Sequence, residues 1–265
     1  MLQDKLLSAT PSAANLPRYK GLIFDFNGVL FWDNPLHEEA WRQYSARLRG
    51  YPLTDREMID HVHGRVNRDI FSYVLGRDVT HDELQQHAVE KEDIYRGLCL
   101  YNPDAFHLSP GAVDLLDFLV DQRIPHTIAT SSAWPNVAFY LEHLELERWF
   151  ERPLLVYDEG RYAGKPAPFI YLEAAERLGL PPAQCVVVED ALAGIAAARA
   201  AGIGRIVALA PERPPAALAA QPGVECTQGQ DMPLSELGWD RPKVRTGRAA
   251  VQGTPETAGG VSAKF

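Results

Sequence analysis

The sequence predicts an α/β fold: a Rossmann-like parallel sheet in a three-layer α/β/α core, with an all-helical cap domain inserted after the first strand. Short apolar runs bounded by turn residues are typical of buried strands. They lie at 21–26, 125–130, 153–157, 185–190 and 204–209. Helical patterns separate most of these runs, and such alternation favours a parallel sheet covered on both faces. The first two runs are about a hundred residues apart, and only helical patterns fill that gap.

The helices of the predicted core follow its strands directly. Apolar residues recur at helical spacing between the later strands. These stretches are 111–121, 134–146, 167–178 and 191–201. We expect the core domain to comprise residues 18–35 and 107–240. Residues 241–265 are rich in Gly, Thr and Ala without periodicity, which predicts a disordered tail.

The inserted segment, 36–106, contains four helical patterns and no strand pattern. They lie at about 36–49, 54–62, 67–75 and 80–97. The first pattern carries one apolar stripe at the spacing of a half-buried helix. Its members are Leu36, Ala40, Trp41, Tyr44 and Leu48. The last pattern begins at Thr80 and Glu83, which are placed for a capping box.

Composition and charge restrict the class of protein. The chain has 265 residues, of which 46% are hydrophobic and 23% charged, with a formal net charge of −9. An acidic surface disfavours nucleic acid and anionic membranes as partners, and no run approaches the roughly 18 apolar residues of a membrane helix. The three cysteines form no CxxC pair and the N-terminus lacks a signal peptide pattern, so we expect a cytoplasmic protein. Its oligomeric state, monomer or small homo-oligomer, is left open by the sequence.

Polar residues follow the predicted strands at the edge of the sheet where ligands bind in open α/β folds. They are Asp25, Thr130, Ser131, Lys165, Glu189 and Asp190. Carboxylates can hold a hard cation such as Mg²⁺ through oxygen ligands, and a lysine with a hydroxyl can hold a phosphate. One carboxylate remains as a nucleophile that would form an aspartyl-phosphate. The set predicts phosphoryl transfer, which needs mainly positioning and charge neutralisation.

Each of these residues taken alone has a simpler interpretation. Asp25 could shape the turn before Gly28, and Thr130 could begin a helix cap. Lys165 alone would be a solvated lysine, and the acids after the fourth strand could favour a helix N-terminus electrostatically. Their occurrence together, in order and at strand ends, favours the catalytic interpretation.

Four segments carry a family resemblance. They are "FDFNGVL", "IATSSA", "GKPAPFIYLEAAERLGL" and "VVVEDALAGIAAARAAG". They resemble the four successive motifs of the haloacid dehalogenase-like superfamily, in the branch of sugar-phosphate phosphatases and β-phosphoglucomutases that has a helical cap after the first motif. The resemblance covers about 18–240 and implies a phosphoric monoester hydrolase that uses Mg²⁺ and acts on a small phosphorylated substrate.

The resemblance also implies roles for the core residues. Asp25 would be the nucleophile and a metal ligand, and Asn27 would give its backbone carbonyl to Mg²⁺. Thr130, with the Ser131 amide, would bind the transferring phosphate.

The remaining motif residues complete the implied site. Lys165 would neutralise the phosphate and the nucleophile, while Glu189 and Asp190 would complete the metal site. In the cap, His37 and Trp41 occupy positions where phosphoglucomutase-like members have these residue types, and "HGRVNRDIF" resembles the substrate loop, with Arg65 as its contact.

Asn27 departs from the family pattern, in which an aspartate protonates the leaving alcohol and then deprotonates water. An amide hydrogen-bonds but cannot cycle a proton, and the help of a general acid–base is worth about 10²–10⁴ in rate. We therefore expect an attenuated phosphatase that loses least on acyl or aryl phosphates. The alternatives are a β-phosphoglucomutase-like mutase and a non-catalytic phosphate-ester-binding protein. His37 either replaces part of the base function or serves only as a hinge residue of the cap.

Other branches of the superfamily fit less well. Dehalogenases carry an aromatic residue at the position of Asn27 and do not need the metal pair. Phosphonate-cleaving members need a cap lysine for a Schiff base. The single lysine of the insert is Lys91, which lies beside Glu90 and Glu92 and is expected to be an exposed charge.

Overall fold

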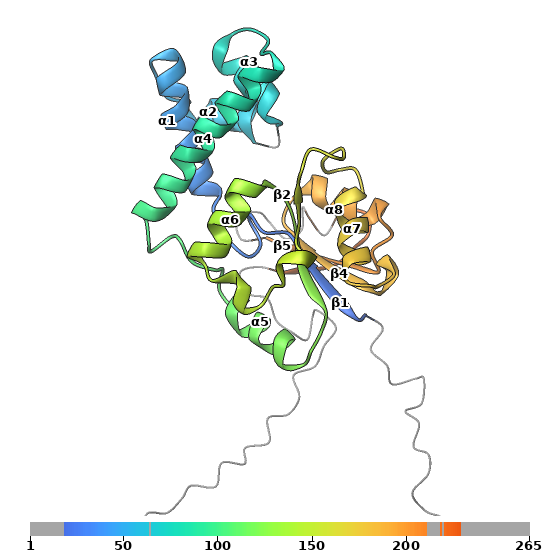
Figure 1. The fold of residues 1–265 in the computed structure, drawn as a ribbon. Helices are drawn as coiled ribbons and strands as arrows, with labels where there is room; N and C mark the ends of the chain where they lie inside the picture. Colours follow the sequence, from blue (N-terminus) through green and yellow to red (C-terminus); the bar gives the residue numbers. More distant parts are fainter. Residues whose placement is uncertain (1–18, 64, 211–217, 219, 229–265) are drawn as a thin grey trace, which may run out of the picture.

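The computed structural model describes residues 19–63, 65–210, 218 and 220–228. The expected tail at 241–265 lies outside the described residues. The predicted architecture is confirmed: six parallel strands form one sheet in the order β3-β2-β1-β4-β5-β6, with helices packed on it. Figure 1 shows a second layer of helices, α1 to α4, standing apart from the sheet.

All five expected strands are present, and the described residues hold a sixth. The strands are β1 (Gly21–Phe24), β2 (His126–Ala133), β3 (Val156–Asp158), β4 (Cys185–Glu189), β5 (Arg205–Leu209) and β6 (Val224–Gln228). Phe24 of the central strand β1 pairs with Ile128 of β2 and with Val188 of β4. This register brings the carboxyl ends of β1, β2 and β4 to the same edge of the sheet.

Four helices cover the two faces of the sheet. They are α5 (Ala112–Asp121), α6 (Trp134–His143), α7 (Phe169–Arg177) and α8 (Leu192–Ala200). Alternate residues of β1 pack into different cores, because side chains of a strand point to opposite faces in turn. Phe24 joins the core that contains α5 and α6, whereas Ile23 joins the core that contains α7 and α8.

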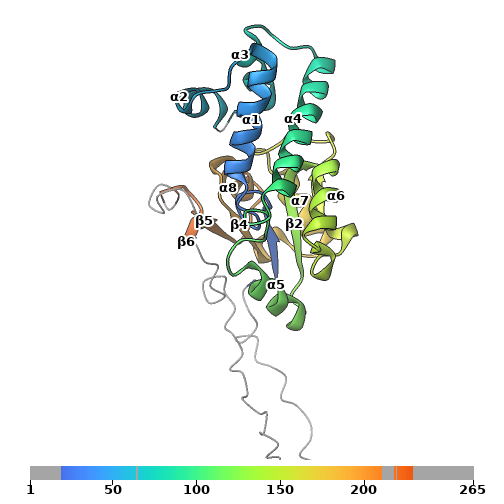
Figure 2. The ribbon, with the colours of Figure 1, turned by 90° about the vertical axis from the view of Figure 1, so that its left-hand side faces the viewer.

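The segment between β1 and α5 is helical, as expected. It contains α1 (Asn34–Arg49), α2 (Asp55–Glu57), a π-helical turn (Met58–Val62), α3 (Asn67–Leu75) and α4 (His81–Tyr101). Thr80 and Glu83 form the predicted capping box at the start of α4. Trp41 and Tyr44 of α1 pack on Phe71 of α3. Figure 2 shows α1 and α4 side by side above the sheet, and we call α1 to α4 the cap.

Short turns complete the core. Three 3₁₀ turns lie at Leu146–Arg148, Arg152–Leu154 and Pro182–Gln184.

Among the described residues, no helix has both the length and the apolar character needed to cross a bilayer.

A close approach of helix to strand fixes the start of α8. A Cβ atom added to Gly194 would lie 1.6 Å from Glu189 Oε1. Glu189 is fully buried at the end of β4, so its carboxylate cannot move aside into solvent.

We predict that Gly194→Ala destabilises the protein. Overpacking of a buried site typically costs about 1–3 kcal/mol, which calorimetry would detect as a lower Tm. Gly97→Ala in α4 is the matched control, because an added Cβ there meets nothing within 4 Å. It should stabilise the helix by about 0.5–1 kcal/mol. Equal Tm values for the two variants would contradict this packing.

Candidate active site

A cleft of about 620 Å³ lies between the cap and the carboxyl edge of the sheet. The core contributes polar side chains to its lining, among them Asp25, Asn27, Thr130, Ser131, Ser132 and Asn136. The cap contributes a second polar group, His37, Lys91, Glu92 and Arg96, together with the apolar side chains of Leu84 and Val89. The cleft therefore joins a charged floor to a mixed polar and apolar roof.

Lys165 lies between two buried carboxylates at the floor. Its Nζ atom is 3.0 Å from Asp25 Oδ2 and 2.7 Å from Glu189 Oε1. The backbone N–H of Phe26 donates to Asp25 Oδ1 over 2.8 Å. Both oxygens of Asp25 are thus oriented, one by its own turn and one by the ammonium group.

Glu189 is held by four donors. Lys165 and the Tyr171 hydroxyl donate to Oε1, at 2.7 Å and 2.9 Å. The backbone N–H groups of Asp190 and Ala191 donate to Oε2, at 2.8 Å and 2.7 Å. A fully buried carboxylate is stable only with such partners, and its fixed position in turn anchors Lys165.

The described residues contain a cluster suited to a hard cation. Oxygen atoms of Asp25, Glu189 and Asp190 all lie within 4.8 Å of one another. A Cβ at Gly28, where φ is 78°, would lie 2.3 Å from Asp190 Oδ2. The glycine thus lets the first turn approach the acidic pair. Carboxylate oxygens at this spacing fit Mg²⁺ or a similar ion. Asp25 and Asp190 are the foremost ligands, because each oxygen of Glu189 already accepts two hydrogen bonds, whereas each oxygen of Asp25 has one donor and keeps a lone pair.

Burial and neighbouring charges together determine the pKa values of Asp25, Glu189 and Lys165. Burial raises the pKa of Asp25 well above its usual value; Lys165 opposes this, and the neighbouring carboxylates add to it. Burial also acts against ionisation of Glu189, but Lys165 and the backbone N–H of Ala191 leave its pKa below the usual value. Burial would lower the pKa of Lys165, but the two carboxylates hold it above the usual value. Lys165 is therefore an ammonium group throughout the physiological range.

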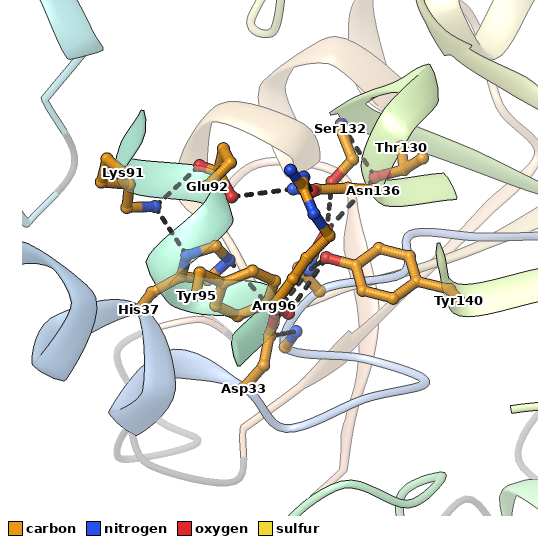
Figure 3. A network of polar contacts seen from close by, with 12 residues as sticks. Asp33, His37, Lys91, Glu92, Tyr95, Arg96, Thr130, Ser132, Asn136 and Tyr140 are labelled. Atoms are coloured by element: carbon orange, nitrogen blue, oxygen red, sulfur yellow. Dashed lines mark hydrogen bonds and ion pairs between the residues drawn. The ribbon is translucent and has the colours of Figure 1, made fainter. Parts of the chain in front are cut away.

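The Asn27 side chain is fixed by hydrogen bonds at both ends, and Figure 3 labels its partners Asp33, Tyr140, Thr130 and Ser132. Its Nδ2 atom donates to Asp33 Oδ2 over 2.5 Å and to the Tyr140 hydroxyl over 3.0 Å. Its Oδ1 atom accepts from Ser132 Oγ over 2.8 Å and from Thr130 Oγ1 over 3.4 Å. These partners assign the amide orientation, since a flipped amide would place two acceptors against each other.

The second strand brings its hydroxyl groups next to Asn27. β2 continues to Ala133, so Thr130 and Ser131 lie within the strand near its end. Thr130 is buried and accepts from the Ser132 backbone N–H over 3.1 Å, whereas Ser131 is exposed to the cleft. Ser132 was missed as a site residue, although it follows directly in the same motif.

Asp33 is a second residue that the sequence analysis missed. It is fully buried where the chain enters α1. Burial acts to raise its pKa, but hydrogen bonds from His37, Tyr95 and Asn27 leave the pKa below its usual value. A carboxylate six residues after Asn27, at the start of a helix, was a visible signal, but its side chain would normally be assigned to helix capping.

His37 lies at the cleft with both ring nitrogens engaged. Its Nε2 is 3.2 Å from Asp33 Oδ2, and its Nδ1 is 2.8 Å from Lys91 Nζ. An ammonium group only donates, so Nδ1 accepts and the proton lies on Nε2, facing Asp33. The imidazole also stacks on the ring of Tyr95 at 3.8 Å.

The expected exposure of Lys91 is wrong. Its relative exposure is 3%, and its Nζ donates to Glu92 Oε1 over 2.7 Å and to His37. The ammonium also lies 5.2 Å from the ring centroid of Trp41. Neighbouring acids on one helix suggested a solvated charge, whereas helix packing turns Lys91 towards α1, where Glu92 and the aromatic ring replace water.

Trp41 and Arg65, the other two cap residues singled out in the sequence, are not among the described residues that line the cleft. Trp41 is buried against Phe71, with ring centroids 5.0 Å apart, and packs within the cap. Arg65 is exposed.

The fold and the site together define a class of protein. A parallel α/β core with a helical cap presents a buried aspartate, a lysine paired with it and a further acidic pair at one sheet edge. This arrangement is that of a capped hydrolase with an α/β core.

Comparison with known proteins gives the family. Residues 19–202 match the model of the haloacid dehalogenase-like hydrolases, and the chain belongs to this family. It is 32% identical over 191 residues to a phosphorylated carbohydrates phosphatase of Thermotoga maritima, covering 71% of this chain and 83% of the relative. It is 33% identical over 192 residues to the fructose-1-phosphate phosphatase YqaB of Escherichia coli, covering 71% and 96%.

Two further matches define the branch. The chain is 31% identical over 191 residues to the β-phosphoglucomutase of Bacillus subtilis, covering 69% of this chain and 80% of the relative. The crystal structure of a family IA, variant 3 hydrolase from Entamoeba histolytica superposes with a TM-score of 0.74 at 34% identity, covering 78% of this chain and 92% of that chain. The protein therefore lies in the branch of sugar-phosphate phosphatases and β-phosphoglucomutases, and its hydrolase family with the phosphatases among these relatives makes it a phosphoric monoester hydrolase.

We predict that Asp25→Asn raises the Tm of the metal-free protein. The native state holds the Asp25 proton more tightly than the unfolded chain, so this group lowers stability as pH rises from its unfolded pKa of about 3.9 through its raised native value. Removing the charge relieves repulsion from Glu189 and Asp190, while Lys165 keeps Glu189 as a partner. Thermal unfolding in EDTA at neutral pH would measure the rise.

The same variant should lose its response to Mg²⁺. A ligand at 100 times its Kd stabilises the native state by about 2.7 kcal/mol. The Tm of wild type should therefore be higher in Mg²⁺ than in EDTA. Asp121→Asn, an exposed position on α5, is the control and should behave as wild type. An unchanged response in Asp25→Asn would contradict a metal site at this carboxylate.

Proposed function

We propose that the protein is a Mg²⁺-dependent phosphatase that acts on a small phosphorylated metabolite, such as a sugar phosphate, through an aspartyl-phosphate on Asp25. The single observation that carries this proposal is the Lys165 ammonium 3.0 Å from Asp25 Oδ2, at the floor of the cleft. A carboxylate held in this way has a fixed direction of attack and a cation beside the developing charge. When bound, Mg²⁺ would supply further neutralisation of phosphate charge at Asp25, Asp190, Glu189 and the backbone carbonyl of Asn27.

The first half of the reaction is attack by Asp25 on phosphorus. An oxygen of Asp25 forms the new P–O bond while the bond to the leaving alcohol breaks, and the phosphoryl group becomes bound to the aspartate. Lys165 stabilises negative charge on the transferring group, as do the Thr130 hydroxyl and the Ser131 backbone N–H. Water then attacks, inorganic phosphate leaves, and the carboxylate is regenerated.

Asn27 restricts which leaving groups depart readily. Its Oδ1 faces the hydroxyls of Thr130 and Ser132, where an aspartate would exchange a proton with the leaving oxygen. An amide accepts a hydrogen bond there but supplies no proton. Aryl and acyl phosphates, whose leaving groups need no proton, should lose least of the roughly 10²–10⁴ that acid–base help provides.

The cleft lining suits a hydroxylated leaving group. Asn67 and Gln85 bring amide groups into the cleft, and Leu84 and Val89 add apolar side chains to its lining. Amides donate and accept hydrogen bonds without favouring charge, which suits the hydroxyls of a sugar or polyol. The named activities of the Thermotoga maritima and Escherichia coli relatives support the same substrate class.

Two alternatives predict different measurements. Similarity to the Bacillus subtilis enzyme favours a sugar-phosphate mutase, but a mutase must protonate and deprotonate sugar hydroxyls in both directions, which Asn27 hinders. A non-catalytic phosphate-ester-binding protein would keep the same charged cleft and show binding without turnover.

Turnover of an aryl phosphate with Mg²⁺ tests the proposal. We expect wild type to release phosphate and to prefer aryl over alkyl esters, because only alkyl leaving groups need the missing proton. Asp25→Asn should fall to the buffer background, whereas Asp121→Asn should match wild type. Tight Mg²⁺-dependent binding of phosphate esters without phosphate release would contradict the proposal and favour the binding protein.

A further inference from the structure

Asp33 is surrounded by hydrogen-bond donors. Asn27 Nδ2 and the Tyr95 hydroxyl donate to Oδ2, at 2.5 Å and 2.6 Å. His37 Nε2 lies 3.2 Å from the same oxygen, and the Gly28 backbone N–H donates to Oδ1 over 3.3 Å. Each of these contacts of the buried carboxylate is therefore with a donor.

The side chain of Asp33 does not serve the helix that it begins. Asp33 is the N-cap residue of α1, yet its side chain makes no capping hydrogen bond. Only its backbone carbonyl accepts from the first turn, from the N–H groups of Leu36 and His37. An aspartate at the N-cap usually stabilises its helix through the side chain, so the inward direction of the Asp33 side chain points to another task.

The Asp33 side chain instead accepts a hydrogen bond from the amide of Asn27. Asn27 receives hydroxyl donors at Oδ1, from Ser132 and Thr130, and presents donors at Nδ2 to Asp33 and Tyr140. The side chain at position 27 must therefore accept on one end and donate on the other. Asparagine does both, whereas an ionised aspartate only accepts.

We propose that Asp33 is the positioning residue that fixes the Asn27 amide, with its oxygen towards the phosphate-binding hydroxyls, and that the two residues form a matched donor–acceptor pair. This inference deepens the proposed function, on which its catalytic consequence rests. Position 27 cannot regain an efficient acid–base carboxylate by a single substitution, because Asp33 would then oppose it acceptor to acceptor. The restriction to leaving groups that need no proton is thus a property of the pair.

The pair is tested by exchanging its two members. Asn27→Asp puts a carboxylate oxygen where a donor stood, 2.5 Å from Asp33 Oδ2. The double variant Asn27→Asp/Asp33→Asn restores a donor between the two positions. Asn27→Asp/Asp33→Ser offers a second donor in case the first exchange disturbs α1. Tyr95→Phe in the Asn27→Asp background is the matched control, because it alters Asp33 without supplying a donor to position 27.

Thermal unfolding in EDTA gives a readout that does not need activity. We expect Asn27→Asp to lower Tm, and each double variant to recover about 2–4 °C beyond the sum of the single effects. The Tyr95→Phe combination should recover nothing. Additive effects in both double variants would overturn the proposal, whatever the enzyme does.

The ratio of alkyl-phosphate to aryl-phosphate turnover gives the catalytic readout, and it is independent of the fraction of active protein. Relative to Asn27→Asp, the double variants should raise this ratio at least tenfold, with about 10²–10⁴ as the full value of general acid–base help. An equal ratio in single and double variants would overturn the catalytic consequence. Failure of the proposed function has a different signature, namely no Asp25-dependent turnover in wild type.

Discussion

The buried ion pair group at the end of β1 is the constraint on which the site depends. Lys165 is 9% exposed at its side chain and contacts Asp25 and Glu189, which are 11% and 0% exposed. Without Lys165, the buried carboxylates of Asp25 and Glu189 would lose their shared counter-charge, and such uncompensated buried charge typically costs about 3–5 kcal/mol. The ammonium group therefore allows three carboxylates to gather at one sheet edge. In the proposed reaction it would also orient Asp25 for attack and place a positive charge where the phosphoryl group develops negative charge.

A second network joins the core to the cap. From Asn27 it passes to Asp33 and His37, and then to Lys91, whose partner Glu92 accepts from Asn136 of α6 over 2.8 Å. The network leaves the core, crosses α1 and α4, and returns to the core. The position of the cap and the orientation of residue 27 are thus parts of one hydrogen-bonded arrangement, and Figure 3 shows its members Asp33, His37, Lys91, Glu92 and Asn136.

The fold could be predicted from the sequence because its signals are local. Apolar runs marked β1 to β5, and helical spacing marked the cap. β6 was missed, although Pro222 and Gly223 mark a turn directly before it, because its five-residue segment, "VECTQ", lacks the apolar run that marked the other strands. The expected helix at 54–62 is a short α-helix followed by a π-helical turn, a difference in hydrogen bonding that residue spacing does not reveal.

The site was predictable where residues follow strands, because parallel strands bring their ends together. Asp25, Lys165, Glu189 and Asp190 converge as the motif order indicated. Asp33 and Lys91 were not predictable as network residues, because their roles depend on how α1 and α4 pack rather than on neighbouring sequence. A charge beside other charges looks solvated until a second helix covers it. Asn27 raised the right question in the sequence, but its partner could be identified only in the folded chain.

The most direct measurement of the central claim is to identify the residue that carries the phosphoryl group during turnover. An aryl phosphate labelled at phosphorus is mixed with the Mg²⁺-loaded protein, quenched in acid within the first turnovers, and the protein is digested and mapped. The account predicts an acid-stable, alkali-labile label in the peptide that contains Asp25, and none in Asp25→Asn. Label on another residue, or steady turnover with no labelled protein at any time, would contradict it.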